Sequence, residues 1–393
     1  MGLSRDNRLM AAALLLWGVG EGLFAYIQPL YLKQLGADPA TIGAVLAVAA
    51  GVAVFFHLPA GYLSDHLGRK QVLLVGWGLG LLATVLMFAA NSLETFTVAL
   101  VLYTTTMFVG GPINSYVVEA RGAQSEQRAL TLVSAGFWGG TIASPAVGGW
   151  IGQEFGLRWV YGVALVMFVL SCLAIFFLRP QALVVPEHGQ SRYAELFTNR
   201  RFINLMALMF FAFFGIQVGL PLMPNFVQEV RGYNVQAVGW LGTVTSASTV
   251  LVNLRYGQRA PRRGFFLAQI LLFLSMAFLL MVNGWPGVAL AYAFRASWPL
   301  ARNMANAQVR RVVSAAEIGL AFGVFETVGA LALALGPWLA GQLYARAPAL
   351  PFQASLILIA LAAPVVWLFA PRREESVEAV AAPLSTEAAD LSN

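Results

Sequence analysis

The sequence predicts an all-α membrane protein with twelve transmembrane helices, arranged as two six-helix bundles. Of the 393 residues, 59% are hydrophobic and 11% are charged, whereas a soluble domain has roughly 45–50% apolar and about 25% charged residues. Apolar residues in this number would fill about twelve spans of about twenty residues each. A repeat between the two halves of the chain, described below, groups these spans into two sets of six.

Twelve apolar runs are bounded by charged or turn residues, and each is long enough to cross about 30 Å of hydrocarbon as a helix. They cover residues 9–32, 40–63, 71–90, 95–118, 129–152, 157–178, 202–228, 236–254, 264–283, 285–308, 317–343 and 350–370. A helix satisfies its own backbone hydrogen bonds in lipid. Each run is therefore predicted to be a transmembrane helix.

The basic residues indicate the orientation of these helices. If the N-terminus is cytoplasmic, eighteen of the 24 Lys and Arg residues fall in cytoplasmic segments, and two lie within a span. The four on the outer side are Lys33, Arg158, Arg231 and Arg346. Because an excess of Lys and Arg marks cytoplasmic loops, we expect a multi-pass inner-membrane protein with both termini in the cytoplasm. The short basic clusters between apolar runs do not indicate nucleic-acid binding.

A hydrophilic stretch between the sixth and seventh spans divides the chain. We predict an N-terminal six-helix bundle (1–178), a cytoplasmic central loop (179–201), a C-terminal six-helix bundle (202–370) and a disordered cytoplasmic tail (371–393). The tail is acidic and lacks apolar periodicity, which is typical of disorder.

The two halves contain a repeated segment. Residues 29–43 (PLYLKQLGADPATIG) align with residues 224–239 (PNFVQEVRGYNVQAVG) with one inserted residue. Both have a proline, an aromatic residue, a polar loop and a glycine that opens the next span. A repeat of six spans in the same orientation predicts two bundles related by a pseudo-two-fold axis along the membrane normal, with a binding site between them near the midplane.

The loop between the second and third spans carries a motif. Residues 61–70 read GYLSDHLGRK, and the motif positions are Gly61, Asp65, Gly68, Arg69 and Lys70. In position and spacing this segment resembles the loop motif of the major facilitator superfamily. The resemblance in span number, repeat and motif covers roughly residues 9 to 370. It implies two bundles around a central cavity and transport of a small molecule by alternating access.

The resemblance also implies a role for the charged motif residues. In the family, the aspartate meets the N-terminus of the eleventh helix, and the arginine meets an acid at the end of the fourth. In this chain, Asp65 would face the amides near residues 317–318. Arg69 would face Glu119, forming a latch that holds the cytoplasmic side closed. The alternative is a topology signal with a structural salt bridge, since exposed ion pairs contribute little stability.

The fifth span contains a second segment that is similar to a family motif. It resembles the fifth-helix motif of proton-linked drug antiporters, with Ser144 in place of one glycine. The matching residues are Gly140, Pro145, Gly148 and Gly149. These small residues would also serve close helix packing. The arginine that such antiporters carry in the fourth helix is absent, because three threonines follow Tyr103.

Few ionisable residues lie at lipid depth, where each charge costs about 2.5–3.5 kcal/mol or more. Glu21 lies in the centre of the first span. The resemblance places the first, fourth, seventh and tenth helices around the cavity, so Glu21 is the first candidate for a protonatable or cation-binding group. Glu326, in the eleventh span, is a weaker candidate. Either acid could instead be a structural residue bonded to a neighbouring helix.

Basic and aromatic residues recur at helical spacing in the tenth span. Arg295, Trp298 and Arg302 would share one face of a continuous helix, where they could bind an anionic or planar group. Arg295 is the better substrate candidate, whereas Arg302 is expected to extend toward the cytoplasmic side. Either arginine could instead be the structural partner of an intramembrane acid. Further polar candidates for the cavity wall are Tyr26, Gln28, Tyr103 and Gln217.

These features predict a secondary active transporter, with proton-coupled efflux of a small amphipathic compound as the preferred mode. The alternatives are an uptake permease for a sugar or an organic anion and, less favoured, a non-transporting receptor or scaffold, or a membrane enzyme. The sequence has no phosphate-binding glycine loop, catalytic triad or metal-spaced histidines, so we expect no cofactor, no metal and no enzymatic activity. The expected partners are a small-molecule substrate, protons and the lipid bilayer, and we expect a monomer.

Overall fold

The structure is a computed structural model that describes residues 2–181, 198–313 and 318–369, without the side chains of residues 54, 57–66 and 318–320. Every element in these ranges is a helix. The N-terminal half contains α1 (Arg5–Phe24), α2 (Gln28–Gln34), α3 (Pro39–Leu67), α4 (Arg69–Ala89), α5 (Leu93–Thr105), the 3-10 helix η1 (Thr106–Val109), α6 (Gly110–Glu119), α7 (Glu126–Glu154) and α8 (Leu157–Phe176). The C-terminal half contains α10 (Arg200–Gly219), α11 (Met223–Glu229), α12 (Val235–Tyr256), α13 (Pro261–Met281), α14 (Trp285–Arg295), α15 (Trp298–Val309), α16 (Ile318–Arg346) and α17 (Leu350–Phe369).

All twelve predicted spans coincide with helices. Within the described ranges, nine helices or helical segments are long and apolar enough to cross a membrane, and the pair α1–α2, bent by 46°, makes a tenth. The other two spans are α3, whose described apolar part is short, and α14–α15, which is interrupted and carries Arg295 and Arg302. Most of the predicted central loop and all of the predicted tail lie outside the described residues, so the domain boundaries stay a prediction.

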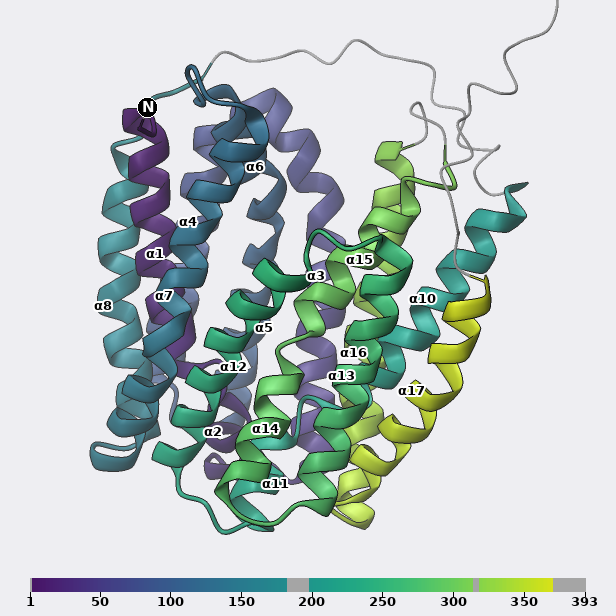
Figure 1. Ribbon diagram of the computed structural model, residues 1–393. Helices are drawn as coiled ribbons and strands as arrows, with labels where there is room; N and C mark the ends of the chain where they lie inside the picture. Colours follow the sequence, from purple (N-terminus) through teal and green to yellow (C-terminus); the bar gives the residue numbers. More distant parts are fainter. Residues whose placement is uncertain (1, 182–197, 314–317, 370–393) are drawn as a thin grey trace, which may run out of the picture.

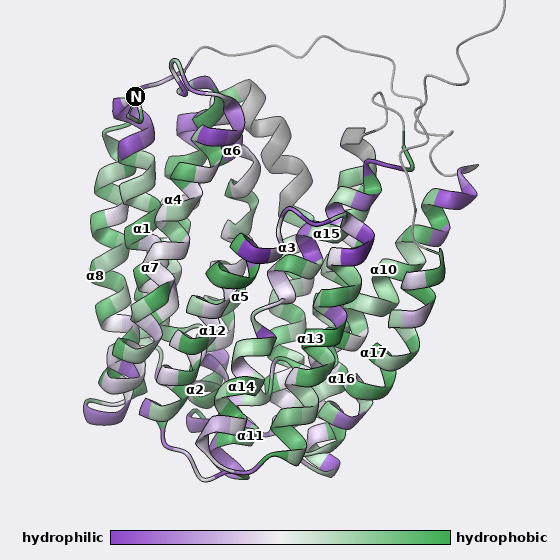
Figure 2. Cartoon of the chain, in the orientation of Figure 1, coloured by the Kyte–Doolittle hydropathy of each residue, from purple (hydrophilic) through white to green (hydrophobic). Residues whose placement is uncertain are grey.

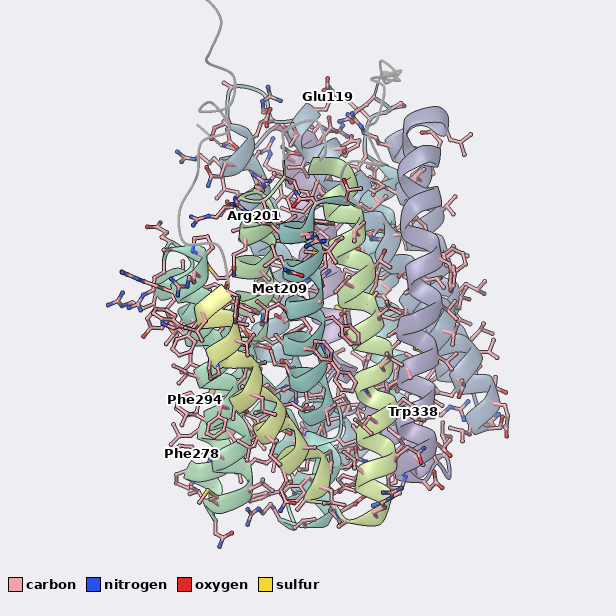
Figure 3. All side chains as sticks on the ribbon, turned by 90° about the vertical axis from the view of Figure 1, so that its right-hand side faces the viewer. Glu119, Arg201, Met209, Phe278, Phe294 and Trp338 are labelled. Atoms are coloured by element: carbon pink, nitrogen blue, oxygen red, sulfur yellow. The ribbon has the colours of Figure 1, made fainter. Side chains whose placement is uncertain are left out.

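The helices pack in two groups that lie side by side (Figure 1). In the N-terminal half α1 packs on α7 and α8, and α4 packs on α5 and α8; in the C-terminal half α10 packs on α16 and α17, and α13 packs on α14, α15 and α17. Hydrophobic residues dominate the middle of the helices, and hydrophilic residues gather at both ends (Figure 2). Glu119 and Arg201 lie toward the end that carries the N-terminus, and Trp338 lies toward the opposite end (Figure 3).

The repeated segments form the same turn in both halves. Gly36 and Gly232 have φ of 96° and 73°, a region that a glycine enters without steric cost. The next helix is then capped by a side-chain oxygen, from Asp38 to the amide of Thr41 (2.7 Å) and from Asn234 to the amide of Ala237 (2.9 Å). The hydrogen bond from the Thr41 amide lowers the pKa of Asp38. The sequence repeat is therefore also a structural repeat.

The two halves meet through backbone contacts, which we call the seam. A Cβ atom on Gly43 of α3 would lie 2.4 Å from the carbonyl oxygen of Pro337 and 2.9 Å from the Cα of Gly341, both in α16. A Cβ atom on Gly239 of α12 would lie 2.5 Å from the carbonyl oxygen of Pro145 in α7.

The second contact also brings Gly239 against Gly149, whose Cα would lie 2.7 Å from the added Cβ. Gly43 and Gly239 are the aligned last residues of the two repeated segments. Each meets a proline and the glycine four residues after it in the opposite half, so the seam consists of two equivalent contacts.

Polar contacts also join the two halves beside the seam. Lys33 of α2 forms a 2.6 Å ion pair with Glu229 of α11, and the hydroxyl of Tyr344 donates a 2.7 Å hydrogen bond to the same carboxylate. These contacts join α2 of one half to α11 and α16 of the other. In Figure 1, α2 and α11 lie at the end opposite the N-terminus.

We predict that Gly149→Ala separates the halves at the seam. The added methyl group would meet the backbone of α12, and such overpacking costs about 1–3 kcal/mol. Spin labels on the exposed residues Gln34 and Val230 should therefore show a longer distance by electron–electron double resonance. Gly139→Ala on the same helix is the control, because a Cβ there has nothing within 4 Å. Equal distances in the two variants would contradict the prediction.

Candidate functional site

A cavity of about 820 Å³ lies between the two halves. Its wall is built mainly from α1, α3, α5, η1 and α6 of the N-terminal half and from α15 and α16 of the C-terminal half. Most lining residues are apolar or aromatic. Among the described lining residues, the charged ones are Glu21, Arg302 and Glu326.

Glu21 lies between two glycines, Gly20 and Gly22, which face the adjacent helices and leave the Glu21 side chain on the cavity side of α1. A Cβ atom on Gly20 would lie 2.4 Å from the ring of Phe168 in α8, and one on Gly22 would lie 2.0 Å from the hydroxyl oxygen of Ser144 in α7. These two glycines allow α1 to pack closely against α7 and α8. The carboxylate between them faces the other way, into the cavity.

Among the described residues, the Glu21 carboxyl group has a polar contact but no ion-pair partner. The hydroxyl of Tyr103 donates a 3.1 Å hydrogen bond to its Oε2 atom. Across the described ranges, no Lys, Arg or His nitrogen lies within 4.0 Å of this carboxylate. Trp17, one helical turn before Glu21, stacks on Phe168 at a centroid distance of 4.1 Å, and the Tyr103 ring lies 6.2 Å from Trp17 and 6.0 Å from Phe168. The acid therefore lies at the edge of an aromatic cluster.

The other two charges of the wall neutralise each other. A guanidinium nitrogen of Arg302 in α15 forms an ion pair with Glu326 in α16. Both side chains are about two-fifths exposed and line the cavity. Trp298 lies one turn before Arg302 on the same helix and also lines the cavity. The net charge of the described wall therefore comes from Glu21.

The predicted substrate and proton residues divide into two groups. Five line the cavity: Glu21, Gln28, Tyr103, Trp298 and Glu326. Three are not among the lining residues: Tyr26, Gln217 and Arg295. Gln217 is 5% exposed and packs where Gly336 lets α16 approach α10.

The structure places the two arginines of the tenth span differently from the prediction. Arg302 lines the cavity, whereas Arg295 lies beside Tyr26 and Met223, away from the lining residues. The helix is interrupted between Arg295 and Trp298, so the two arginines do not share one helical face. The predicted shared face required a continuous helix. Trp17 and Phe322 line the cavity but were not among the predicted residues, although each lies four residues before a cavity acid on the same helix, a spacing that places them on the same face.

The described part of the loop motif contains one contact of the proposed latch. Arg69 lies 4.0 Å from Glu119, and its guanidinium donates a 3.1 Å hydrogen bond to Gln181. Gly68 has φ of 96° and joins α3 to α4, and Lys70 lies over the ring of Phe176. The predicted latch residues Gly61 and Asp65 lie outside the described side chains.

The fifth-helix motif is a packing face of α7. A Cβ on Gly140 would lie 2.3 Å from the carbonyl oxygen of Leu15, and one on Gly148 would lie 1.9 Å from that of Leu23, both in α1. Pro145 and Gly149 lie in the seam. This face therefore holds α1 on one side and α12 on the other, which brings Glu21 close to the boundary between the halves.

The amino-acid sequence is similar to those of known membrane proteins. The family model described as Major Facilitator Superfamily matches residues 10–297 and 208–389. The chain is 24% identical over 296 residues to the multidrug resistance protein MdtG of Proteus mirabilis, covering 70% of this chain and 73% of that protein. It is 26% identical over 228 residues to the multidrug resistance efflux pump PmrA of Streptococcus pneumoniae, covering 55% of this chain and 56% of the pump.

Solved structures share the fold at low sequence identity. The nucleoside transporter NupG superposes with a TM-score of 0.74 at 17% identity, covering 93% of this chain and 98% of that one. A bacterial homolog of the human lysosomal transporter Spinster gives 0.72 at 14% identity, covering 92% and 96%. These matches confirm the predicted fold class of two six-helix bundles. Because the family model matches well over half of its residues, the chain belongs to the Major Facilitator Superfamily.

Proposed function

We propose that this transporter exports a small amphipathic compound in exchange for protons. The observation that carries the proposal is the carboxyl group of Glu21, which has no ion-pair partner among the described residues and lies in the wall of a cavity between the two halves. A carboxyl group at membrane depth can bind a proton or a cationic group, and it needs a wet cavity or a partner to be charged there. The names of the relatives, a multidrug resistance protein and an efflux pump, support export.

The cavity wall favours a neutral or cationic amphipathic compound over the organic anion of the alternative proposal. Arg302 is neutralised by Glu326, so the described wall presents no uncompensated positive charge to an anion. Trp17, Tyr103, Trp298 and Phe322 supply aromatic surface, and aromatic faces attract organic cations.

We place both termini in the cytoplasm, in the inner membrane, because eighteen of the 24 basic residues then lie on the cytoplasmic side. The seam then closes the outer side of the cavity, and the structure corresponds to the inward-open state. Transport would proceed as the seam opens and the cytoplasmic ends approach each other. One chain supplies both sides of the cavity, so we propose that a monomer is the working unit and that no covalent chemistry is involved.

In this mechanism, protons and the cationic compound compete for Glu21. On the cytoplasmic side the ionised carboxylate, held by the hydroxyl of Tyr103, binds the compound. After the cavity opens outward, protonation of the carboxylate removes the charge that holds the compound and allows its release. The protonated carboxyl group then returns to the cytoplasmic side and loses the proton.

We predict that Glu21→Gln removes the response of transport to pH. Inside-out vesicles with an acidic interior should accumulate tetraphenylphosphonium through the wild-type protein, with the membrane potential clamped. The variant should lose accumulation by about tenfold, within the usual range of coupling between two ligands. The control is Glu154→Gln, at the exposed end of α7. Accumulation that persists in Glu21→Gln and reverses with the gradient would disprove the role of this acid.

We also predict that Glu326→Gln weakens binding of tetraphenylphosphonium, because it leaves the positive charge of Arg302 uncompensated in the cavity wall. A loss of affinity of about tenfold corresponds to about 1.4 kcal/mol. The double variant Arg302→Gln, Glu326→Gln should regain most of the affinity, because it is again neutral at this position. Isothermal titration of the purified proteins measures both. Equal affinities in the single and double variants would show that the pair does not act through its charge.

A further inference from the structure

A second cluster of polar groups lies at the seam, apart from the cavity wall. The guanidinium carbon of Arg295 lies 5.4 Å from the ring centre of Tyr26 and 5.6 Å from that of Tyr292. One of its nitrogens lies 3.9 Å from the sulfur of Met223. The cluster combines residues of α14 and its neighbour α11 with one residue of the N-terminal half.

Arg295 has no acidic partner in the part of the chain that the structure describes. No described carboxylate oxygen lies within 4.0 Å of its guanidinium nitrogens. An arginine at membrane depth is normally paired or faces water. Its position in the last turn of α14 lets the helix dipole offset part of the cost, but the five N–H donors of the guanidinium are not satisfied in this way.

The hydroxyl group of Tyr292 is a second unsatisfied group in the cluster. The Tyr292 side chain is fully buried and lies against Arg295, and its hydroxyl donates to no acceptor among the described residues. Leaving a buried hydroxyl donor unpaired is unfavourable. A hydroxyl donor next to a guanidinium group is an arrangement that suits a carboxylate or another small anion.

Tyr26 covers this cluster from the opposite half. It lies between α1 and α2, and its hydroxyl is 3.5 Å from that of Ser246 in α12. Gly242 allows the close approach, since a Cβ there would lie 2.7 Å from the Tyr26 ring. Tyr26 belongs to one half, whereas Arg295, Tyr292 and Ser246 belong to the other. Opening of the seam would therefore carry the tyrosine ring away from the arginine.

We propose that Arg295 and Tyr292 form an anion-binding subsite for a carboxylate group, which Tyr26 covers while the seam is closed and uncovers when the seam opens. The subsite rests on the alternating access of the proposed function, but it does not depend on proton coupling at Glu21. In the open-seam state the guanidinium would bind an anion from the outer side and would repel a cation that leaves the cavity.

The test uses a cysteine as a local probe of charge. Ser246→Cys is introduced with Cys172→Ala, and Gly43→Leu is added to wedge the seam open; Gly239→Leu is the second wedge if the first variant does not fold. The cysteine is modified from the outer side with an anionic sulfonatoethyl and a cationic trimethylammonioethyl methanethiosulfonate. Arg295→Gln is compared with Arg302→Gln, which removes the same charge from the cavity wall.

We expect the Gly43→Leu wedge to make the cysteine at position 246 reactive, and we expect the anionic reagent to modify it faster than the cationic reagent. Arg295→Gln should lower the ratio of anionic to cationic rates by about fivefold, as a unit charge several ångströms away predicts in a wet environment, and Arg302→Gln should change it much less. Sodium benzoate should slow modification only when Arg295 is present.

Three results would overturn the subsite: a cysteine that stays unreactive in both wedge variants, a rate ratio that is unchanged by Arg295→Gln, or benzoate protection that survives it. The modification rates are measured without transport. A negative result for proton-coupled efflux would therefore leave the subsite standing, and a negative result for the subsite would leave the proposed efflux standing.

Discussion

The arrangement of the molecule depends on two places where the backbones of its halves touch. At Gly43 with Pro337, and at Gly239 with Pro145, no side chain separates the helices. In a membrane, helices are held together by van der Waals packing, and small residues make that packing close. Since the two contacts are related by the repeat, they bring α3 to α16 and α7 to α12 in the same manner. The cavity lies beside these contacts, and both α3 and α16 contribute to its wall.

The same packing determines which charges the membrane can tolerate. Glu21 lies between two glycines that hold α1 against its neighbours, so its carboxylate points into the cavity rather than into lipid. Arg302 and Glu326 come from adjacent helices and neutralise each other at the cavity wall. Each isolated charge at this depth would cost about 2.5–3.5 kcal/mol or more. The cavity lowers this cost for Glu21, and the ion pair lowers it for Arg302 and Glu326.

The sequence was sufficient for the number of spans, their grouping and the position of Glu21, because these depend on the length of apolar runs and on a repeat that can be aligned by eye. It was insufficient for the interruptions within spans. The unexpected positions of Arg295 and Arg302 follow from one such interruption. A signal was present: Pro29, Pro224 and Pro299 each lie in the first turn of the helix that follows a break, where proline is favoured. Tyr26 lies in the break between α1 and α2 and packs on α12 instead of lining the cavity.

The interruption between α14 and α15 gives the two arginines different surroundings on one span. Arg302 stays with the cavity and with Glu326, whatever the position of the seam, because both belong to the C-terminal half. Arg295 has a ring of the opposite half as its cover, so its environment changes when the halves move. A cavity that presents a carboxylate on one side of the membrane and gains a guanidinium on the other does not bind a cation equally in both states. A ligand or a proton can shift the equilibrium between the two states only if its affinity differs between them. In this protein the break between α14 and α15 provides that difference, because it places the two arginines of one span in different surroundings.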